Sequence, residues 1–200
     1  VLIGLIEQSL IVADIDGDRY RMLETVRAYA QEKLVEAGAT DAITRRHAQH
    51  LRDRFERAPD DWLRLPDMDW RRTYAPELDN VRAALDWAFG SEGDSAIGVA
   101  LAAASGPLWM ELSLPVEGRR RLEDAVALIG AQTPEVDQAR LWLCLGMLVG
   151  EANPARSMAA TERACELYRG LGDATRCGFS LVLLGDMLAK MGRAEQAPAI

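Results

Sequence analysis

Short interruptions divide the second half of this chain into stretches that each have the apolar periodicity of an α-helix. Each break is only a few residues long and rich in Gly, Pro or Asp, which favour turns. Because so short a link makes consecutive helices lie side by side and antiparallel, the pattern predicts a stack of helical hairpins. The expected helices are 95–112, 115–129, 134–150, 154–171, 173–191 and one that begins at Arg193.

Two of these stretches repeat the same kinds of residue at the same spacing. The first set is Trp142, Leu145, Gly146 and Val149, and the second is Leu181, Leu184, Gly185 and Leu188. A small residue allows two helices to cross closely, and the large apolar residues fill the space beside it. The spacing resembles that of a tetratricopeptide repeat, so we expect a tetratricopeptide-like antiparallel helical-hairpin array, an α-solenoid, over residues 39–200.

Residues 1–38 have a different pattern. Residues 1–10 suit the end of a short helix, and two β-prone runs follow, separated by an Asp16-Gly17 pair that suits a tight hairpin turn. Residues 23–37 then place one apolar stripe on a helix that ends at Gly38, and one side of this helix should be buried. The order helix, hairpin, helix predicts the C-terminal half of a winged helix, with a small β-hairpin, in an otherwise mainly α chain.

In a winged helix, residues 1–10 would be the helix that reads the DNA major groove. Their polar side chains are Glu7, Gln8 and Ser9, without any Lys or Arg to contact phosphates. The chain as a whole has 31 acidic and 23 basic residues, for a formal charge of -8, which repels polyanions. We therefore expect DNA to be bound only through a domain outside this sequence.

The histidines and cysteines do not predict a metal site. His47 and His50 could bind an ion from one helix face, but no cysteine or further histidine is near them in the sequence. Packing at the core or its edge explains them better, and a pH-dependent charge is the lesser alternative. Cys144, Cys165 and Cys177 form no CxxC pair and are interpreted as small buried apolar residues.

The stretch 59–89 contains the polar residues that most resemble a catalytic set. By composition, residues 59–69 should form a loop, and Pro76 should lie in the first turn of the helix that follows. The polar set is Glu77, Asp79, Asn80, Arg82 and Asp86. No nucleophile, oxyanion donor or Gly-rich phosphate loop is near it, so capping and salt links explain it better. We therefore expect no catalytic, cofactor-binding or metal-binding residues, and no enzyme activity.

The sequence also predicts a cytoplasmic protein. Its longest apolar run, residues 96–114, is interrupted by Ser105, Gly106, Pro107 and Glu111, and is shorter than the roughly 20 apolar residues that span a bilayer. No export signal is visible at the start. We therefore expect no contact with membranes.

Four segments together resemble the winged-helix and tetratricopeptide part of bacterial STAND-class regulators, the large ATP-dependent transcription factors of LuxR type. They are LIEQSLI at 5–11, RYRMLETVRAYA at 19–30, RHA at 46–48 and ELDNVRAALDWA at 77–88. The resemblance implies an upstream DNA-binding domain and a P-loop ATPase. Because this chain has no GxxxxGK[ST] motif, ATP and Mg²⁺ are expected only in that missing upstream domain.

The resemblance implies a non-catalytic regulatory, sensor and protein-interaction fragment of a larger ATP-dependent transcriptional regulator. Its expected partners are a protein or peptide in the concave face of the repeats and the upstream ATPase domain of the same protein. The alternative is a free-standing tetratricopeptide-type adaptor or scaffold with no role in transcription. An upstream reading frame that encodes a P-loop would separate the two.

Overall fold

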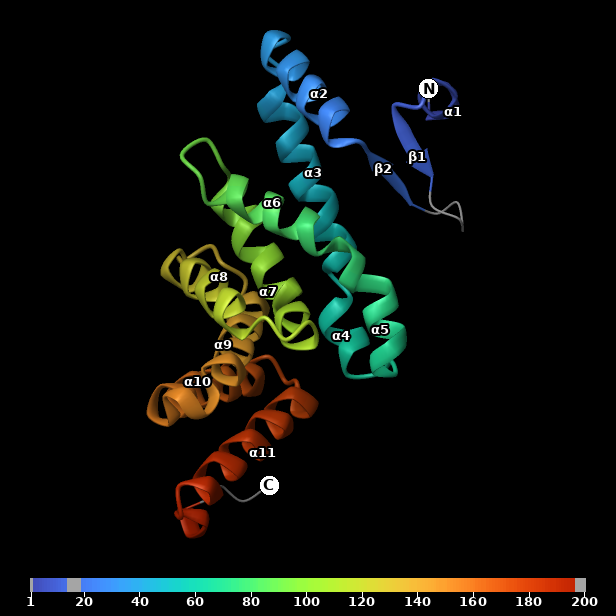
Figure 1. The fold of residues 1–200 in the computed structure, drawn as a ribbon. Helices are drawn as coiled ribbons and strands as arrows, with labels where there is room; N and C mark the ends of the chain where they lie inside the picture. The colour runs from blue at the N-terminus through green and yellow to red at the C-terminus, as the bar shows by residue number, and fades with distance from the viewer. Residues whose placement is uncertain (1, 14–18, 197–200) are drawn as a thin grey trace. The chain divides into compact units, whose positions relative to one another are not determined.

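The computed structural model describes residues 2–13 and 19–196. The chain forms two compact units, Val1–Thr44 and Arg45–Ile200, and each is described here by itself. Both are mainly helical (Figure 1). Among the described residues, no helix is long and apolar enough to cross a bilayer.

The first unit is built on a short antiparallel hairpin. Its elements are α1 (Leu2–Glu7), β1 (Ile11–Ala13), β2 (Tyr20–Met22) and α2 (Glu24–Glu36). In the hairpin Ile11 lies opposite Met22 and Ala13 lies opposite Tyr20. The order of helix, two strands and helix is as expected, and the predicted turn at Asp16-Gly17 lies outside the described residues.

Helix α2 ends where the sequence predicts but is not buried as predicted. Gly38 adopts a φ of +62°, and its backbone N–H donates to the carbonyl of Val35, which closes the helix. Within α2, all of which the structure describes, no residue is buried, and Val35 is 68% exposed. The prediction that one face of this helix is buried is therefore wrong. Two three-residue strands and a six-residue helix have too little apolar surface to cover another helix.

The second unit is entirely helical in its described part. Its elements are α3 (Thr40–Phe55, which begins in the first unit), α4 (Ala58–Trp62), α5 (Asp67–Tyr74), η1 (Ala75–Glu77), α6 (Leu78–Ala88), α7 (Ser95–Glu111), α8 (Pro115–Ala127), α9 (Glu135–Val149), η2 (Gly150–Ala152), α10 (Pro154–Gly170), α11 (Ala174–Lys190) and η3 (Ala194–Gln196). The five helices expected between residues 95 and 191 are confirmed as α7 to α11. Pro76 lies in η1, directly before α6.

Residues 59–69 are not the loop that their composition suggests. They contain most of α4 and the beginning of α5. Pro59 lies in the first turn of α4, where the missing N–H of proline costs no helical hydrogen bond. The indole Nε1 of Trp70 donates to the Ala58 carbonyl at 2.9 Å, and the Tyr74 hydroxyl donates to Asp61 at 2.6 Å. These contacts from α5 hold α4 in place. The pattern of neighbouring residues in the sequence does not predict them.

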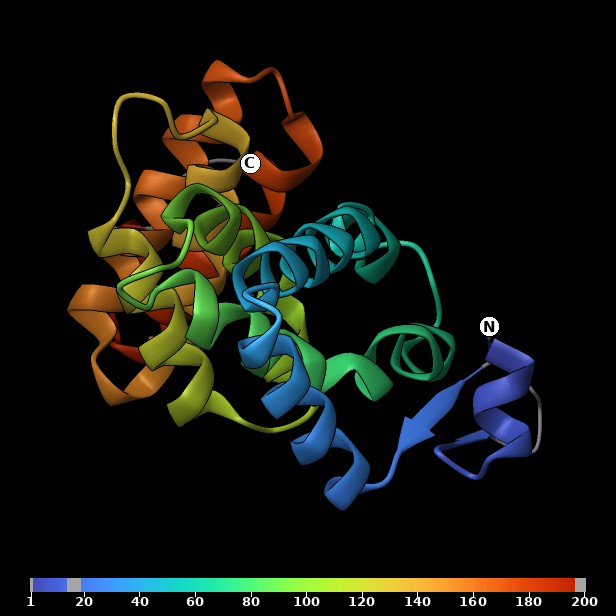
Figure 2. The same cartoon turned by 90° about the horizontal axis from the view of Figure 1, so that it is seen from above.

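Helix α7 is the centre of the second unit. It packs against α4, α5, α6, α8 and α9, and it lies among them in Figure 1. Most of its residues are buried. From α7 onward each helix packs against the next, and α7 also packs against α9. Figure 2 shows the unit from above, with α8, α9 and α10, in yellow to orange, gathered on one side. Two apolar clusters fill the unit, one around α7 and one between α9, α10 and α11.

Candidate interaction groove

His47 and His50, the two histidines considered as metal ligands from the sequence, both lie on α3. His47 is half-buried, and its pKa lies below 6.5 because burial and the neighbouring His50 both disfavour the charged form. Among the described residues, no group of three or more His, Cys, Asp or Glu side chains could hold a metal ion.

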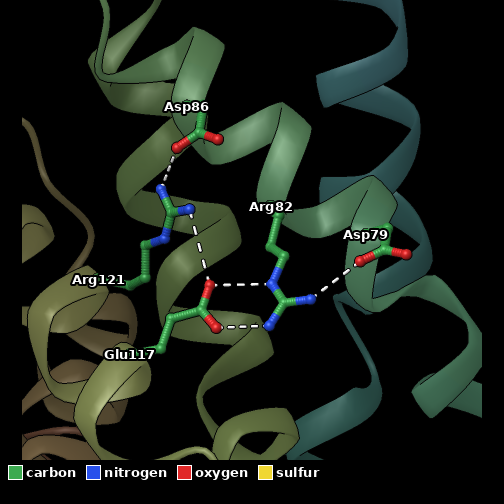
Figure 3. A network of polar contacts seen from close by, with 5 residues as sticks. All are labelled: Asp79, Arg82, Asp86, Glu117 and Arg121. Carbon is green, nitrogen blue, oxygen red and sulfur yellow. Dashed lines mark hydrogen bonds and ion pairs between the residues drawn. The ribbon is translucent and has the colours of Figure 1, made fainter.

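The polar residues of α6 instead join this helix to α8 (Figure 3). Arg82 donates to both carboxylate oxygens of Glu117, at 2.9 and 2.6 Å, and also to Asp79 at 2.9 Å. Arg121 donates to Asp86 and lies 3.8 Å from Glu117. Two-point pairing between a guanidinium and a carboxylate sets both distance and orientation. The network therefore links α6 to α8 and constrains their relative orientation.

We expect this network to make the second unit sensitive to acid. The hydrogen bond from Arg82 is the main cause that lowers the pKa of Glu117 below 4.5. A carboxyl group with a lowered pKa stabilises the fold above its unfolded pKa and loses that effect as pH falls through the folded value. Glu117→Gln should therefore lower the free energy of unfolding by about 1 kcal/mol at pH 7, and by much less near pH 3.

Urea unfolding followed by circular dichroism at several pH values measures this difference. Glu162→Gln, on an exposed position of α10, is the control and should change the free energy of unfolding little at any pH. An equal loss for Glu117→Gln at pH 7 and pH 3 would show that the ion pair does not contribute.

Two adjoining hollows form an open groove on the second unit. They have volumes of about 410 and 580 Å³, and both are lined by Arg52, Ala100, Pro134 and Asp137. Residues from α3, the first half of α7, the loop after α8 and the start of α9 make up the walls. We call this surface the α3–α7–α9 groove.

The lining of the groove combines apolar and charged side chains. Ala100 and Ala104 of α7 line it together with Arg52 and Asp53 of α3, Glu56 directly after α3, and Asp137 and Arg140 of α9. Arg52 pairs with Asp53 at 2.6 Å, and Arg140 reaches Asp137 at 3.5 Å. Such a surface offers both an apolar contact and charged groups of either sign.

Two groups in the groove are incompletely paired. Burial raises the pKa of Asp137, which Arg140 only partly offsets, and the negative Glu56 raises it further. The Nε of Arg140 is buried and has no hydrogen-bond partner among the described residues. A buried donor without a partner costs free energy.

Helix α4 covers the neighbouring part of the same surface. The Trp62 ring meets the Phe179 ring of α11 edge to face at 6.1 Å, and Asp60 forms an ion pair with Arg176. A small space of about 20 Å³ remains between α4, α7, α9, α10 and α11, and Arg140 lines both this space and the groove. The chain thus covers one part of this surface with its own helix and leaves the α3–α7–α9 groove open.

A larger hollow of about 670 Å³ lies at the start of α8. Residues 113–123 alone supply its lining, and Val116 there is 73% exposed. Because one short segment forms it, it is a shallow surface feature. The α3–α7–α9 groove, built from three segments of the chain, 49–56, 94–104 and 128–140, is the better candidate for an interaction site.

No protein-family model matches this sequence, and no solved structure matches it. Three curated proteins, one from Mycobacterium bovis and two from strains of Mycobacterium tuberculosis, are each 39% identical to it over 110 residues. All three carry the provisional name of HTH-type transcriptional regulator. The match covers 52% of this chain but only 12% of each relative. Over half its length, this chain is thus similar to a small segment of bacterial proteins named as transcriptional regulators.

Proposed function

We propose that this chain is a regulatory, non-catalytic part of a larger bacterial transcriptional regulator, and that the α3–α7–α9 groove receives a protein or peptide. Residues 1–38 act as the C-terminal part of a winged helix, and residues 39–200 act as a tetratricopeptide-like array. An upstream STAND-class ATPase of LuxR type holds ATP and Mg²⁺, and a further domain binds DNA.

Similarity to named transcriptional regulators supports the regulatory role. The hairpin followed by α2 supports the winged-helix part, and the consecutive packing of α7 to α11 supports the repeat array. The proposal of a binding role rests on the groove. It is open, and its lining combines apolar and charged side chains.

The groove is large enough for part of a partner chain. Its two hollows fall within the range of about 300 to 1,000 Å³ that is typical of ligand sites. An extended surface of stacked helices suits a peptide segment. A carboxylate of the partner would pair with Arg52, whose side chain is 41% exposed, and a basic group would lie near Glu56.

Helix α3 could couple an occupant of the groove to the first unit, because the chain runs through this helix from one unit to the other. Helix α3 lines the groove through Gln49 and Arg52, and the same helix begins at Thr40 in the first unit. An occupant that favours one arrangement of α3 would shift the population of the regulator's states. Such coupling requires two arrangements with different affinities for the occupant.

Filling the groove should change transcript levels in the cell in the same way as deleting the regulator's gene. Ala100 is half-buried and lines both hollows, so Ala100→Trp places a large ring in the open space. Ala159→Trp, at an exposed position of α10, is the matched control. Transcript levels are compared between the two variant strains and a deletion strain. We expect Ala100→Trp to reproduce most transcript changes of the deletion and Ala159→Trp to reproduce none.

A second variant covers the case in which Ala100→Trp does not fold. Glu56→Arg reverses an exposed charge of the groove and should leave the fold intact. Circular dichroism confirms the fold of each purified variant. If both folded groove variants behave like the control, the groove is not the binding site. If the deletion itself changes no transcript, the regulatory proposal fails and a free-standing adaptor is favoured.

A further inference from the structure

Two of the three cysteines meet between α10 and α11. Their Sγ atoms lie 2.9 Å apart, Cys165 on α10 and Cys177 on α11, and both side chains are buried. A disulfide bond has a length of about 2.05 Å, so a small rotation of the two side chains would bring the sulfurs to bonding distance. The third cysteine, Cys144, lies on α9 and is not part of this pair.

A hollow that opens to the surface lies beside Cys165. This hollow of about 330 Å³ is lined by Cys165 together with Glu166 and Arg169 of α10 and Leu181 of α11. The hollow is open toward solvent and has polar groups on the α10 side. A molecule as small as a peroxide can therefore approach Cys165 without unfolding the hairpin.

The electrostatic environment makes the reaction slow but possible. Burial raises the pKa of Cys165 to about 11, and the proximity of Cys177 raises it too. The Arg169 guanidinium donates to the Cys165 sulfur at 3.5 Å and favours the thiolate, which is the reactive form. Oxidation should therefore be faster at alkaline pH than at pH 7.

We propose that Cys165 and Cys177 are a redox pair that a peroxide converts to a disulfide bond between α10 and α11. The Cys165 sulfur attacks the peroxide, an S–O bond forms, the O–O bond breaks and one water leaves. The Cys177 sulfur then attacks the resulting sulfenic acid, the S–S bond forms, the S–O bond breaks and a second water leaves. Two thiols are oxidised by two electrons, and one peroxide is reduced to two waters.

The disulfide would lock the α10–α11 hairpin. It closes the chain between residues 165 and 177, which limits the unfolded state and opposes the separation of the two helices. In the reduced protein the hairpin is held by packing around Tyr168 and Cys177. Oxidation therefore makes the last long helix of the described chain harder to detach. This inference does not depend on the proposed groove.

The test treats the whole purified chain with hydrogen peroxide and then blocks the remaining thiols in denaturant. Before blocking, we expect the intact mass to be lower than that of the untreated chain by two hydrogen atoms. In denaturant, one thiol out of three should stay available for blocking. Trypsin cleaves after Arg163, Arg169, Arg176 and Lys190, so the cysteines fall in two peptides, 164–169 and 177–190. Mass spectrometry should find these two peptides joined.

Thermal unfolding provides a second measurement. The midpoint should rise by about 8 °C on oxidation and return after dithiothreitol. Cys165→Ser and Cys177→Ser should abolish both the joined peptides and the rise, whereas Cys144→Ser should keep them. The wild-type peptide map does not depend on how well any variant folds. Three blockable thiols after peroxide, or a disulfide that includes Cys144, would overturn the proposal.

Discussion

Replacing Trp70 by alanine should lower the free energy of unfolding of the second unit by about 4 kcal/mol. Trp70 is completely buried, and its ring packs against Tyr74 with the ring centres 4.9 Å apart. Its Nε1 donates to the carbonyl of Ala58, so the substitution also leaves a buried acceptor without that partner. Both the cavity and the lost hydrogen bond act on the same junction between α4 and α5.

Two further variants separate these contributions. Trp70→Phe keeps most of the ring volume but removes the donor, and should cost about 1 to 2 kcal/mol. Met68→Ala, also on α5, changes a side chain that is 68% exposed and should change stability by less than about 0.5 kcal/mol. Urea unfolding followed by circular dichroism measures all three. A Trp70→Ala protein as stable as Met68→Ala would refute the role given to this contact.

The same substitution should have opposite effects at two glycines of the second unit. A Cβ at Gly118 of α8 would lie 2.6 Å from the Cγ of Trp109 and closer still to its Cβ. Trp109 is completely buried and cannot move aside cheaply. Gly118→Ala should therefore destabilise the unit by about 2 kcal/mol, because the overpacking exceeds the gain in helix propensity.

Gly178 of α11 is the matched control. A Cβ there would meet no atom within 4 Å, so Gly178→Ala should gain up to about 1 kcal/mol from helix propensity alone. The two variants should thus differ by about 3 kcal/mol in urea unfolding. If both stabilise the protein, the close approach of α8 to α7 is not required for the fold.

The helices from α7 to α11 could be predicted because their signals are local. Proline and glycine at the links and the apolar spacing within each stretch depend only on nearby residues. The same is true of the end of α2, because Gly38 can adopt a positive φ. The identity of the array as tetratricopeptide-like and of residues 1–38 as part of a winged helix stays a prediction.

The errors arose where long-range contacts decide local structure. Residues 59–69 have the composition of a loop, but hydrogen bonds from Trp70 and Tyr74 hold α4 in place. The apolar stripe of α2 predicted burial, but the first unit offers no surface large enough to cover it. Periodicity shows that a face is apolar and does not show whether a partner exists.

The candidate groove and the cysteine pair could not be found from the sequence. The groove joins residues as distant as Gln49 and Asp137, and no motif links them. The interpretation of the cysteines as small buried residues is confirmed, but their spacing alone did not bring Cys165 and Cys177 together. That contact depends on how α10 and α11 align across Gly172, whose φ of +71° turns the chain between them.

By itself the sequence determined where most helices begin and end, because turn residues and apolar periodicity act over a few neighbouring positions. It also determined that the chain is acidic, with a net charge of -8. Only the tertiary structure decided that α4 covers part of the helical surface, that the α3–α7–α9 groove stays open and that two sulfurs meet. These features arise from packing between residues far apart in the chain, which local patterns do not encode.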